Sequence, residues 1–157
     1  MDSREHIAWF VVVTRWGQWK KISERLDTLK VRYFIPQTYN TLVFLRTEKT
    51  RALNLVNAGE VKGRFLVDHG THSLLEIPDN QMDAFIRVVT ECPEAVLTPE
   101  TPIRKGARVR VVRGSLKGVE GEVVESPSGT TYLVVRILSL LSAKVSIPRE
   151  DLALIEG

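Results

Sequence analysis

The residues of this chain that could do chemistry are mostly basic side chains set close together. Six lysines and arginines and no acid lie between Arg104 and Lys117, in a chain of 157 residues with a formal net charge of +3. A local excess of cations is typical of a surface that binds a polyanion such as nucleic acid or a ribosome. The cluster also suits a solvated strand face, because Glu120, Glu122 and Glu125 follow it closely.

Residues with the spacing of a catalytic or metal centre are scarce. His69 and His72 form the only close histidine pair, and with no cysteine or third histidine beside them a zinc site is not expected. Gly114 and Gly118 fit neither a phosphate-binding loop nor a dinucleotide fingerprint, and Ser115 does not sit in a Gly-x-Ser-x-Gly elbow. We therefore expect a binding protein rather than an enzyme, with no cofactor and no metal.

The composition is that of a globular protein. Hydrophobic residues make up 43% of the chain, which is enough for a core, and no apolar run approaches the roughly 18 residues that span a bilayer. No signal-peptide core follows Met1, and the single Cys92 forbids an intramolecular disulfide. We expect a cytoplasmic monomer without membrane contact.

The first half of the chain alternates between strand and helix patterns. An apolar run from His6 to Arg15 predicts a central strand, and Trp19, Ile22 and Leu26 then repeat at helical spacing. Further strands are predicted over residues 31–36, 41–47, 62–68 and 74–77, with a second helix after residue 47 and a third from residue 78. The pattern predicts an α+β domain over residues 1–92, an antiparallel sheet flanked by helices.

The second half of the chain has a different character. Three prolines between Cys92 and Pro102 predict a stiff, extended linker over residues 93–102. Residues 103–157 then contain short strand patterns separated by turn signals, which is the size and pattern of a small all-β barrel of the SH3-like kind.

Glycine and valine spacing in this second half resembles the KOW motif of ribosomal proteins and of the NusG family of transcription elongation factors. An ordinary glycine-rich hairpin of an unrelated β domain would show similar spacing. A second likeness favours the NusG family: the segment from Trp9 to Lys21 resembles the opening of its N-terminal (NGN) domain, and Tyr39 to Arg46 resembles its Phe-Pro-Gly-Tyr-Val-Phe-Val strand. The KOW spacing is carried by Gly106, Val109, Val111, Gly114, Gly118 and Gly121.

The chain departs from the family pattern at one strand. Asn40, Thr41 and Leu42 replace the Pro-Gly-Tyr core, and the segment between the second and third strands is short. These departures point to the operon-specific paralogues, the RfaH-like or UpxY-like antiterminators. The resemblance then implies a transcription elongation and antitermination factor that acts on specific operons.

The same resemblance implies a partner for each domain. An NGN domain grips the clamp helices of RNA polymerase through an apolar concavity, and a KOW domain recruits a small ribosomal subunit protein or a termination factor. Val13 and Phe44 could instead belong to the core, because strand residues can point either way. The matching polymerase-binding positions are Val13, Tyr39, Leu42, Phe44 and Phe65, and the positions expected to bind the KOW partner are Leu138, Leu140 and Leu141.

Three cations near the first helix form a second candidate surface. Lys21 and Arg25 are one helical turn apart, and Arg15 ends the strand that precedes the helix. Such cations contact phosphates or base edges, and operon-specific family members read the exposed non-template DNA strand with this region. Glu24 and Asp27 are close enough to pair with them, which would leave an ordinary solvated face.

Two further alternatives stay open. A ribosome-associated KOW protein would bind RNA and need no polymerase, although ribosomal KOW proteins lack the segment from Trp9 to Lys21. Residues 133–145 carry both a strand period and a helical stripe. A helical, autoinhibited form of the C-terminal domain, as in the RfaH-like branch, therefore competes with a permanent barrel.

Overall fold

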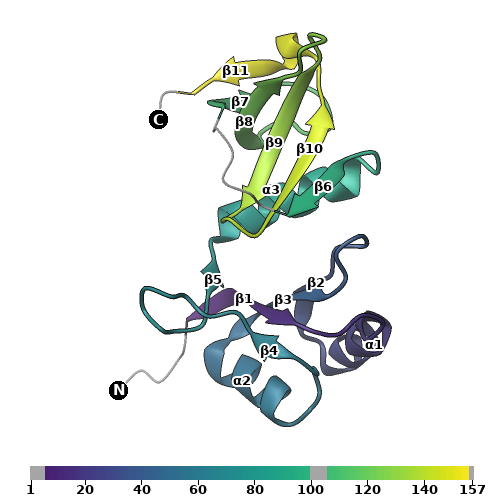
Figure 1. Cartoon of the computed structure of the whole chain (residues 1–157), viewed down its shortest axis with the longest axis vertical. Coiled ribbons are helices and arrows are strands. Elements are labelled where there is room, and N and C mark those ends of the chain that lie inside the picture. The colour runs from purple at the N-terminus through teal and green to yellow at the C-terminus, as the bar shows by residue number, and fades with distance from the viewer. Residues whose placement is uncertain (1–5, 100–105, 156–157) are drawn as a thin grey trace. The chain divides into compact units, whose positions relative to one another are not determined.

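The computed structural model describes residues 6–99 and 106–155. They form two compact units that divide between Asp79 and Asn80 (Figure 1). The first unit mixes strands and helices, and the second is built on a larger sheet, so the predicted order of an α+β part followed by a β-rich part is confirmed. Within these described residues, no helix is both long enough and apolar enough to cross a membrane.

The N-terminal sheet is organised around β1 (Ile7–Val13), the predicted central strand. It pairs along its whole length with β3 (Leu42–Glu48), and its other edge pairs with β4 (Arg64–Phe65) and β5 (Glu76–Ile77). A short strand, β2 (Arg32–Phe34), extends the sheet beyond β3. Every pairing is antiparallel, as the sequence predicted.

Two helices cover one face of this sheet, α1 (Trp19–Leu29) and α2 (Lys49–Asn57). Ile22 of α1 and Leu55 of α2 pack with Val12 in one buried cluster, and Ala52 packs with Phe10 in another. Because side chains alternate along a strand, the neighbours of Phe10 and Val12 point to the opposite face. We call that opposite surface, which turns away from α1 and α2, the far face.

The C-terminal unit contains a six-stranded antiparallel sheet and α3 (Asp79–Glu91), of which only Asp79 belongs to the first unit. A short 3-10 helix, η1 (Arg149–Asp151), precedes the last strand. Residues 133–145, which carried two periods, form two strands and the turn between them. Across the sheet the order is β11 (Leu152–Leu154), β7 (Ala107–Val111), β8 (Glu120–Glu125), β9 (Thr131–Ile137), β10 (Leu141–Ser146) and β6 (Val96–Pro99).

Close approach of strands explains part of the KOW spacing. Gly121 lies in β8, where an added Cβ would come within 2.6 Å of the carbonyl oxygen of Val134. Glycine is the residue that permits such an approach. The valines of the motif, Val109 and Val111, are buried in the core of this sheet.

The segment predicted as a linker takes part in the C-terminal sheet. β6 pairs with Leu141–Lys144 of β10, so residues 96–99 form a strand rather than a free extended segment. Residues 100–102 of the predicted linker, and Arg104 and Lys105 of the basic cluster, lie outside the described residues.

Hydrogen bonds join α3 to two turns of the C-terminal unit, although the sequence analysis assigns this helix to a domain that ends at residue 92. The backbone N–H of Leu138 donates to Oε1 of Gln81 at 2.7 Å, and Arg87 donates to the carbonyl oxygen of Ser115 at 2.9 Å. The compact units divide after the first residue of α3, whereas the domain boundaries at residues 92 and 103 stay a prediction.

Candidate partner-binding and nucleic-acid surfaces

Strand register gathers three of the predicted polymerase-binding residues on the far face. Val13 is the Cα partner of Leu42, and Val11 is the partner of Phe44, so the side chains of these four residues point the same way. Phe44 is fully buried, whereas Val13 and Leu42 are half-buried.

Phe34 belongs to the same surface, although the sequence did not single it out. It is the Cα partner of Phe44, and the two rings contact each other in a tilted arrangement, with centroids 6.2 Å apart and planes at 39°. The signal that would have found it is the antiparallel pairing of β2 with β3, because this pairing fixes which aromatic residues share a face.

Two other predicted positions lie elsewhere. Phe65 is the Cα partner of Val12 and packs against both helix-side clusters, so it does not share the far face. Tyr39 is half-buried in the turn before β3, where its carbonyl oxygen accepts a hydrogen bond from the N–H of Leu42 at 3.1 Å. The structure therefore brings Val13, Leu42 and Phe44 together, places Tyr39 beside their strand, and separates Phe65 from them.

Charged groups border the apolar part of the far face. Arg64 is opposite Val13 in the β1–β4 pairing. Arg32 lies over the ring of Trp9 at 5.1 Å from its centroid, and Arg46 forms an ion pair with Asp79 at 3.3 Å. The hydrogen bond from Arg46 lowers the pKa of the Asp79 carboxyl, so this acid stays ionised. An apolar centre with charged surroundings is the usual anatomy of a protein interface.

The predicted basic edge is only partly assembled. Arg25 forms two hydrogen bonds with the carboxylate of Glu60, the longer of them 2.9 Å. This bond raises the pKa of Arg25 and lowers that of Glu60, so the charge of Arg25 is balanced locally. Lys21 is exposed on α1. The structure does not gather Arg15, Lys21 and Arg25 into one site.

Arg15 instead lines a pocket with two cations that the sequence did not single out. The cavity has a volume of about 690 Å³ and includes Lys62 and Arg64 on its wall, with no carboxylate among its lining residues. The hydroxyl of Thr14 donates to the carbonyl oxygen of Lys62 at 2.5 Å, which ties the loop before β4 to the end of β1. We call this cavity the cationic pocket; its remaining lining residues are Val13, Thr14, Gln18 and Gly63.

The basic cluster of the C-terminal unit is largely paired with acids. Arg110 contacts Glu120 at 2.9 Å and Arg108 contacts the same carboxylate at 3.8 Å. Arg113 lies 3.6 Å from Asp151. These contacts favour the solvated, ion-paired strand face over a polyanion site.

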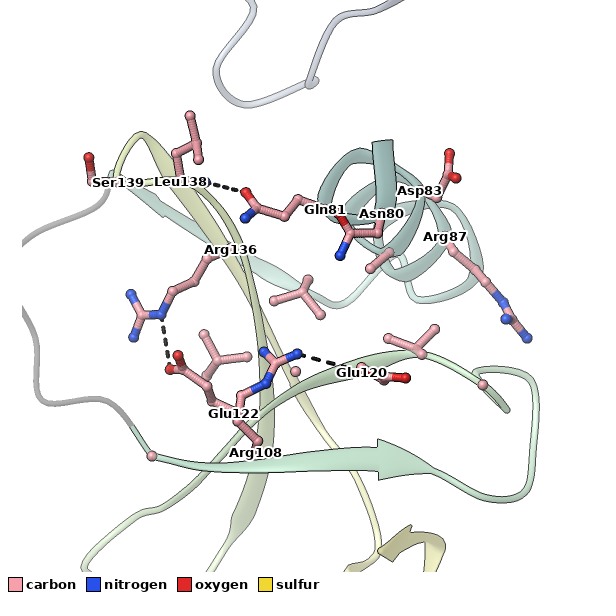
Figure 2. Close-up of a pocket in the computed structure, with 17 residues that line it drawn as sticks. Asn80, Gln81, Asp83, Arg87, Arg108, Glu120, Glu122, Arg136, Leu138 and Ser139 are labelled. Atoms are coloured by element: carbon pink, nitrogen blue, oxygen red, sulfur yellow. Dashed lines mark hydrogen bonds and ion pairs between the residues drawn. The ribbon is translucent and has the colours of Figure 1, made fainter. Parts of the chain in front are cut away.

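A groove of about 1410 Å³ separates α3 from the strands β7, β8 and β9 (Figure 2). Its floor holds an ion pair between Nε of Arg136 and Oε2 of Glu122 at 3.0 Å, with side chains only 15% and 7% exposed. Three arginines and three acids line the groove, so its charges largely balance. Nowhere in residues 6–99 or 106–155 do three or more histidine, cysteine or acidic side chains come close enough to hold a metal ion.

The three leucines predicted to bind a KOW partner differ in burial. Leu141 is 1% exposed and belongs to the sheet core. Leu138 and Leu140 are half-buried in the turn between β9 and β10, where Leu138 adopts a left-handed φ of 47°. Only these two can offer side-chain surface to a partner without unfolding the sheet.

Comparison with solved structures finds a protein with a similar fold. A structure that reports domain interaction in NusG of Thermotoga maritima matches 96% of this chain and 98% of its own, with 18% identity and a TM-score of 0.52. A chain of the MjSpt4:Spt5 complex matches 95% and 97% at 15% identity, but its TM-score of 0.33 is too low to support an argument. No protein-family model and no curated protein sequence matches. This chain therefore has a fold similar to that of NusG over nearly the whole length of both chains.

Proposed function

We propose that this chain is a transcription elongation factor that binds RNA polymerase through the far face and catalyses no reaction. The fold similarity to NusG supports this proposal. The observation that carries it is the register that places Val13, Leu42 and Phe44 on one face of the sheet. Helices of a partner bind to such surfaces through a few apolar anchors.

A single substitution on the far face tests the proposal. Leu42→Asp places a carboxylate in the contact, and burying it unpaired should weaken binding of core RNA polymerase at least tenfold. Val67→Asp is the matched control, because Val67 lies in the same unit but is 43% exposed outside the paired strands β1 and β3. The control should bind as the wild type does.

Two results would overturn the proposal. One is wild-type affinity in a Leu42→Asp variant whose circular dichroism is unchanged. The other is binding to isolated ribosomal subunits without any binding to polymerase, which would assign the chain to the ribosome-associated KOW proteins instead.

We further propose that the factor suppresses termination at specific operons and contacts the non-template DNA strand there. The replacement of the Pro-Gly-Tyr core by Asn40, Thr41 and Leu42 supports a specialised role, and the cationic pocket supplies a surface for phosphates. Transcription in vitro through a terminator, with and without the protein's own upstream DNA, is the test. Equal readthrough on both templates would contradict operon specificity.

The C-terminal strands are proposed to recruit a small ribosomal subunit protein or a termination factor. Leu138 and Leu140 support this contact because the turn presents both at the end of the sheet. Leu140→Asp should reduce capture of the partner while leaving polymerase binding unchanged. Retained capture of both candidate partners by the folded variant would contradict the assignment.

A further inference from the structure

One edge strand of the C-terminal sheet contributes little to the core. β6 lies along β10 at the end of the strand order (Figure 1). Three of its four side chains are exposed, Val96 to 57%, and only Leu97 is half-buried, opposite the fully buried Ala143. A strand that buries so little apolar surface is held mainly by its backbone pairing, and such segments open locally at a low free energy.

The pairing pattern shows which backbone groups β6 covers. On the other side of β10, the N–H of Ile147 donates to the carbonyl oxygen of Thr131 at 3.1 Å. Hydrogen-bonded pairs recur at every second residue of an antiparallel ladder, so the backbone groups of Ala143 also face β9. Those of Ser142 and Lys144 face β6 instead. Without β6, these two residues would present an unpaired strand edge.

The end of β6 adjoins the turn that carries the exposed leucine surface. Pro99 is the Cα partner of Leu141, the first residue of β10. By the same alternation, the nitrogen at this position points away from β10, so the proline removes no hydrogen bond from the ladder. An antiparallel strand that keeps this register and runs past the position of Pro99 comes alongside Leu140. The edge that β6 covers is therefore continuous with the surface proposed to recruit a partner.

We propose that β6 is a removable cover on a strand-binding edge. It occupies β10 until an extended segment of a protein partner pairs with the same backbone groups of Ser142 and Lys144. The partner segment fits when it places an apolar residue opposite Ala143, as β6 places Leu97. When a strand adds to a sheet edge, main-chain hydrogen bonds give the affinity and alternate side chains give the specificity. While β6 is in place, it also protects the edge from pairing with other chains.

Hydrogen exchange tests the cover without any partner. The inference rests on the recruitment proposed for the C-terminal strands, but this measurement needs only the full chain. After correction for intrinsic rates, the amides of Ser142 and Lys144 should exchange at least about tenfold faster than that of Ala143, because opening of β6 exposes only the first two. Equal protection of all three amides would overturn the inference, since β6 would then open only with the whole sheet.

A disulfide between the two strands can hold the cover in place. Thr98 and Ser142 are direct partners, and the Cα atoms of a hydrogen-bonded pair lie about 5.5 Å apart, a separation that a disulfide spans. The variant combines Thr98→Cys and Ser142→Cys with Cys92→Ala, which removes the single natural cysteine. Its oxidised and reduced forms have the same sequence, so the reduced form is the matched control for the oxidised one.

A labelled peptide that copies residues 94–99 is the probe for the open edge. Leu97→Asp in the full chain removes the half-buried side chain that holds β6, so it should tighten binding of the peptide roughly tenfold, because apparent affinity rises with the fraction of open molecules. Ala153→Asp places the same charge at an exposed position of β11, the opposite edge strand, and should bind the peptide as the wild type does. The oxidised disulfide variant should lose the peptide, and reduction should restore binding.

Several results of the peptide assay contradict the inference. Equal binding to the oxidised and reduced disulfide variant would show that the peptide does not use the edge of β10. A Leu97→Asp variant that binds the peptide no more tightly than the wild type would show that β6 is not a cover. If that variant instead self-associates in sedimentation and ignores the peptide, the edge belongs to a second copy of the chain. Failure of the proposed recruitment appears separately, as retained partner capture by Leu140→Asp.

Discussion

The strands of the C-terminal unit and the cationic pocket of the N-terminal unit differ in how their basic side chains are paired. In the C-terminal unit, arginines on the strands pair with acids of neighbouring strands, as Arg110 does with Glu120 and Arg136 does with Glu122. In the N-terminal unit, Arg15 and Lys62 meet across a pocket without a carboxylate on its wall. The unit with the denser basic run in its sequence is therefore the one whose charge is better balanced.

This difference shows that cross-strand register, rather than local charge density, determines where a positive field remains. Arg110 and Glu120 are ten residues apart in sequence but are direct partners in the β7–β8 pairing. A cross-strand pair of opposite charge contributes up to about 1 kcal/mol and removes both charges from long-range attraction.

Removing the buried acid of the C-terminal sheet should have the largest effect. Glu122→Gln replaces the carboxylate that faces Arg136 while keeping its shape, and should lower the free energy of unfolding by about 2 to 4 kcal/mol, because both side chains are largely buried. Urea unfolding gives the total change, and hydrogen exchange assigns it to the C-terminal strands.

A matched exposed pair serves as its control. Glu125 contacts Arg149 at 2.8 Å, but these side chains are 45% and 78% exposed. Glu125→Gln should therefore cost less than about 1 kcal/mol. Equal losses in the two variants would show that burial of the Glu122 pair does not matter.

Adding an acid to the cationic pocket should make the N-terminal unit behave like the C-terminal one. In Gln18→Glu the new carboxylate would face Arg15, Lys62 and Arg64, so single-stranded DNA should bind several-fold more weakly and with a shallower salt dependence. Gln37→Glu places the same charge at an exposed position of the same unit outside the pocket. If both variants lose DNA affinity to the same extent, the net charge of the unit alone explains the loss.

The smallest effect is expected at the exposed pair of Arg25 and Glu60. Its hydrogen bond lowers the pKa of Glu60 from the ordinary value of 4.5. Any stability that the pair adds is thus complete above pH 4.5 and is lost as the pH falls through the lowered pKa. In Arg25→Gln the titration of the Glu60 carboxyl, followed by NMR, should move to higher pH. An unchanged midpoint would mean that the pair does not form in solution.

Local sequence patterns are sufficient to predict a helix that buries a complete apolar stripe or a strand that buries a continuous run of apolar residues. α1 begins at Trp19, the first residue of its apolar repeat, and ends at Leu29, three residues after Leu26. β1 follows from its uninterrupted apolar run in the same way. The predicted strand over residues 62–68 is reduced to β4 and an isolated bridge between Val67 and Leu74. Asp68 then accepts the N–H groups of Gly70 and Thr71 in a turn.

The candidate sites were harder to predict because they depend on pairings between distant segments. Lys62 lies 48 residues from Thr14, and its carbonyl oxygen accepts the hydrogen bond of the Thr14 hydroxyl. No local sequence pattern predicts that contact. The resemblance to the family assigns Phe65 and Val13 to the same polymerase-binding surface by position. A strand partner sets its direction instead, and a shift of one residue in register exchanges the two faces of a strand.

The central position of β1 also bears on how the chain is made. β1 leaves the ribosome before any of its partners, and β5, which completes its second edge, follows roughly 65 residues later, or about 3 to 13 seconds at ordinary rates of translation. During that interval a seven-residue segment without charge or proline has at least one edge that is not fully paired, a combination that favours aggregation. Substitutions that delay the pairing of β1 should therefore reduce the yield of soluble protein in the cell before they reduce the stability of the folded molecule.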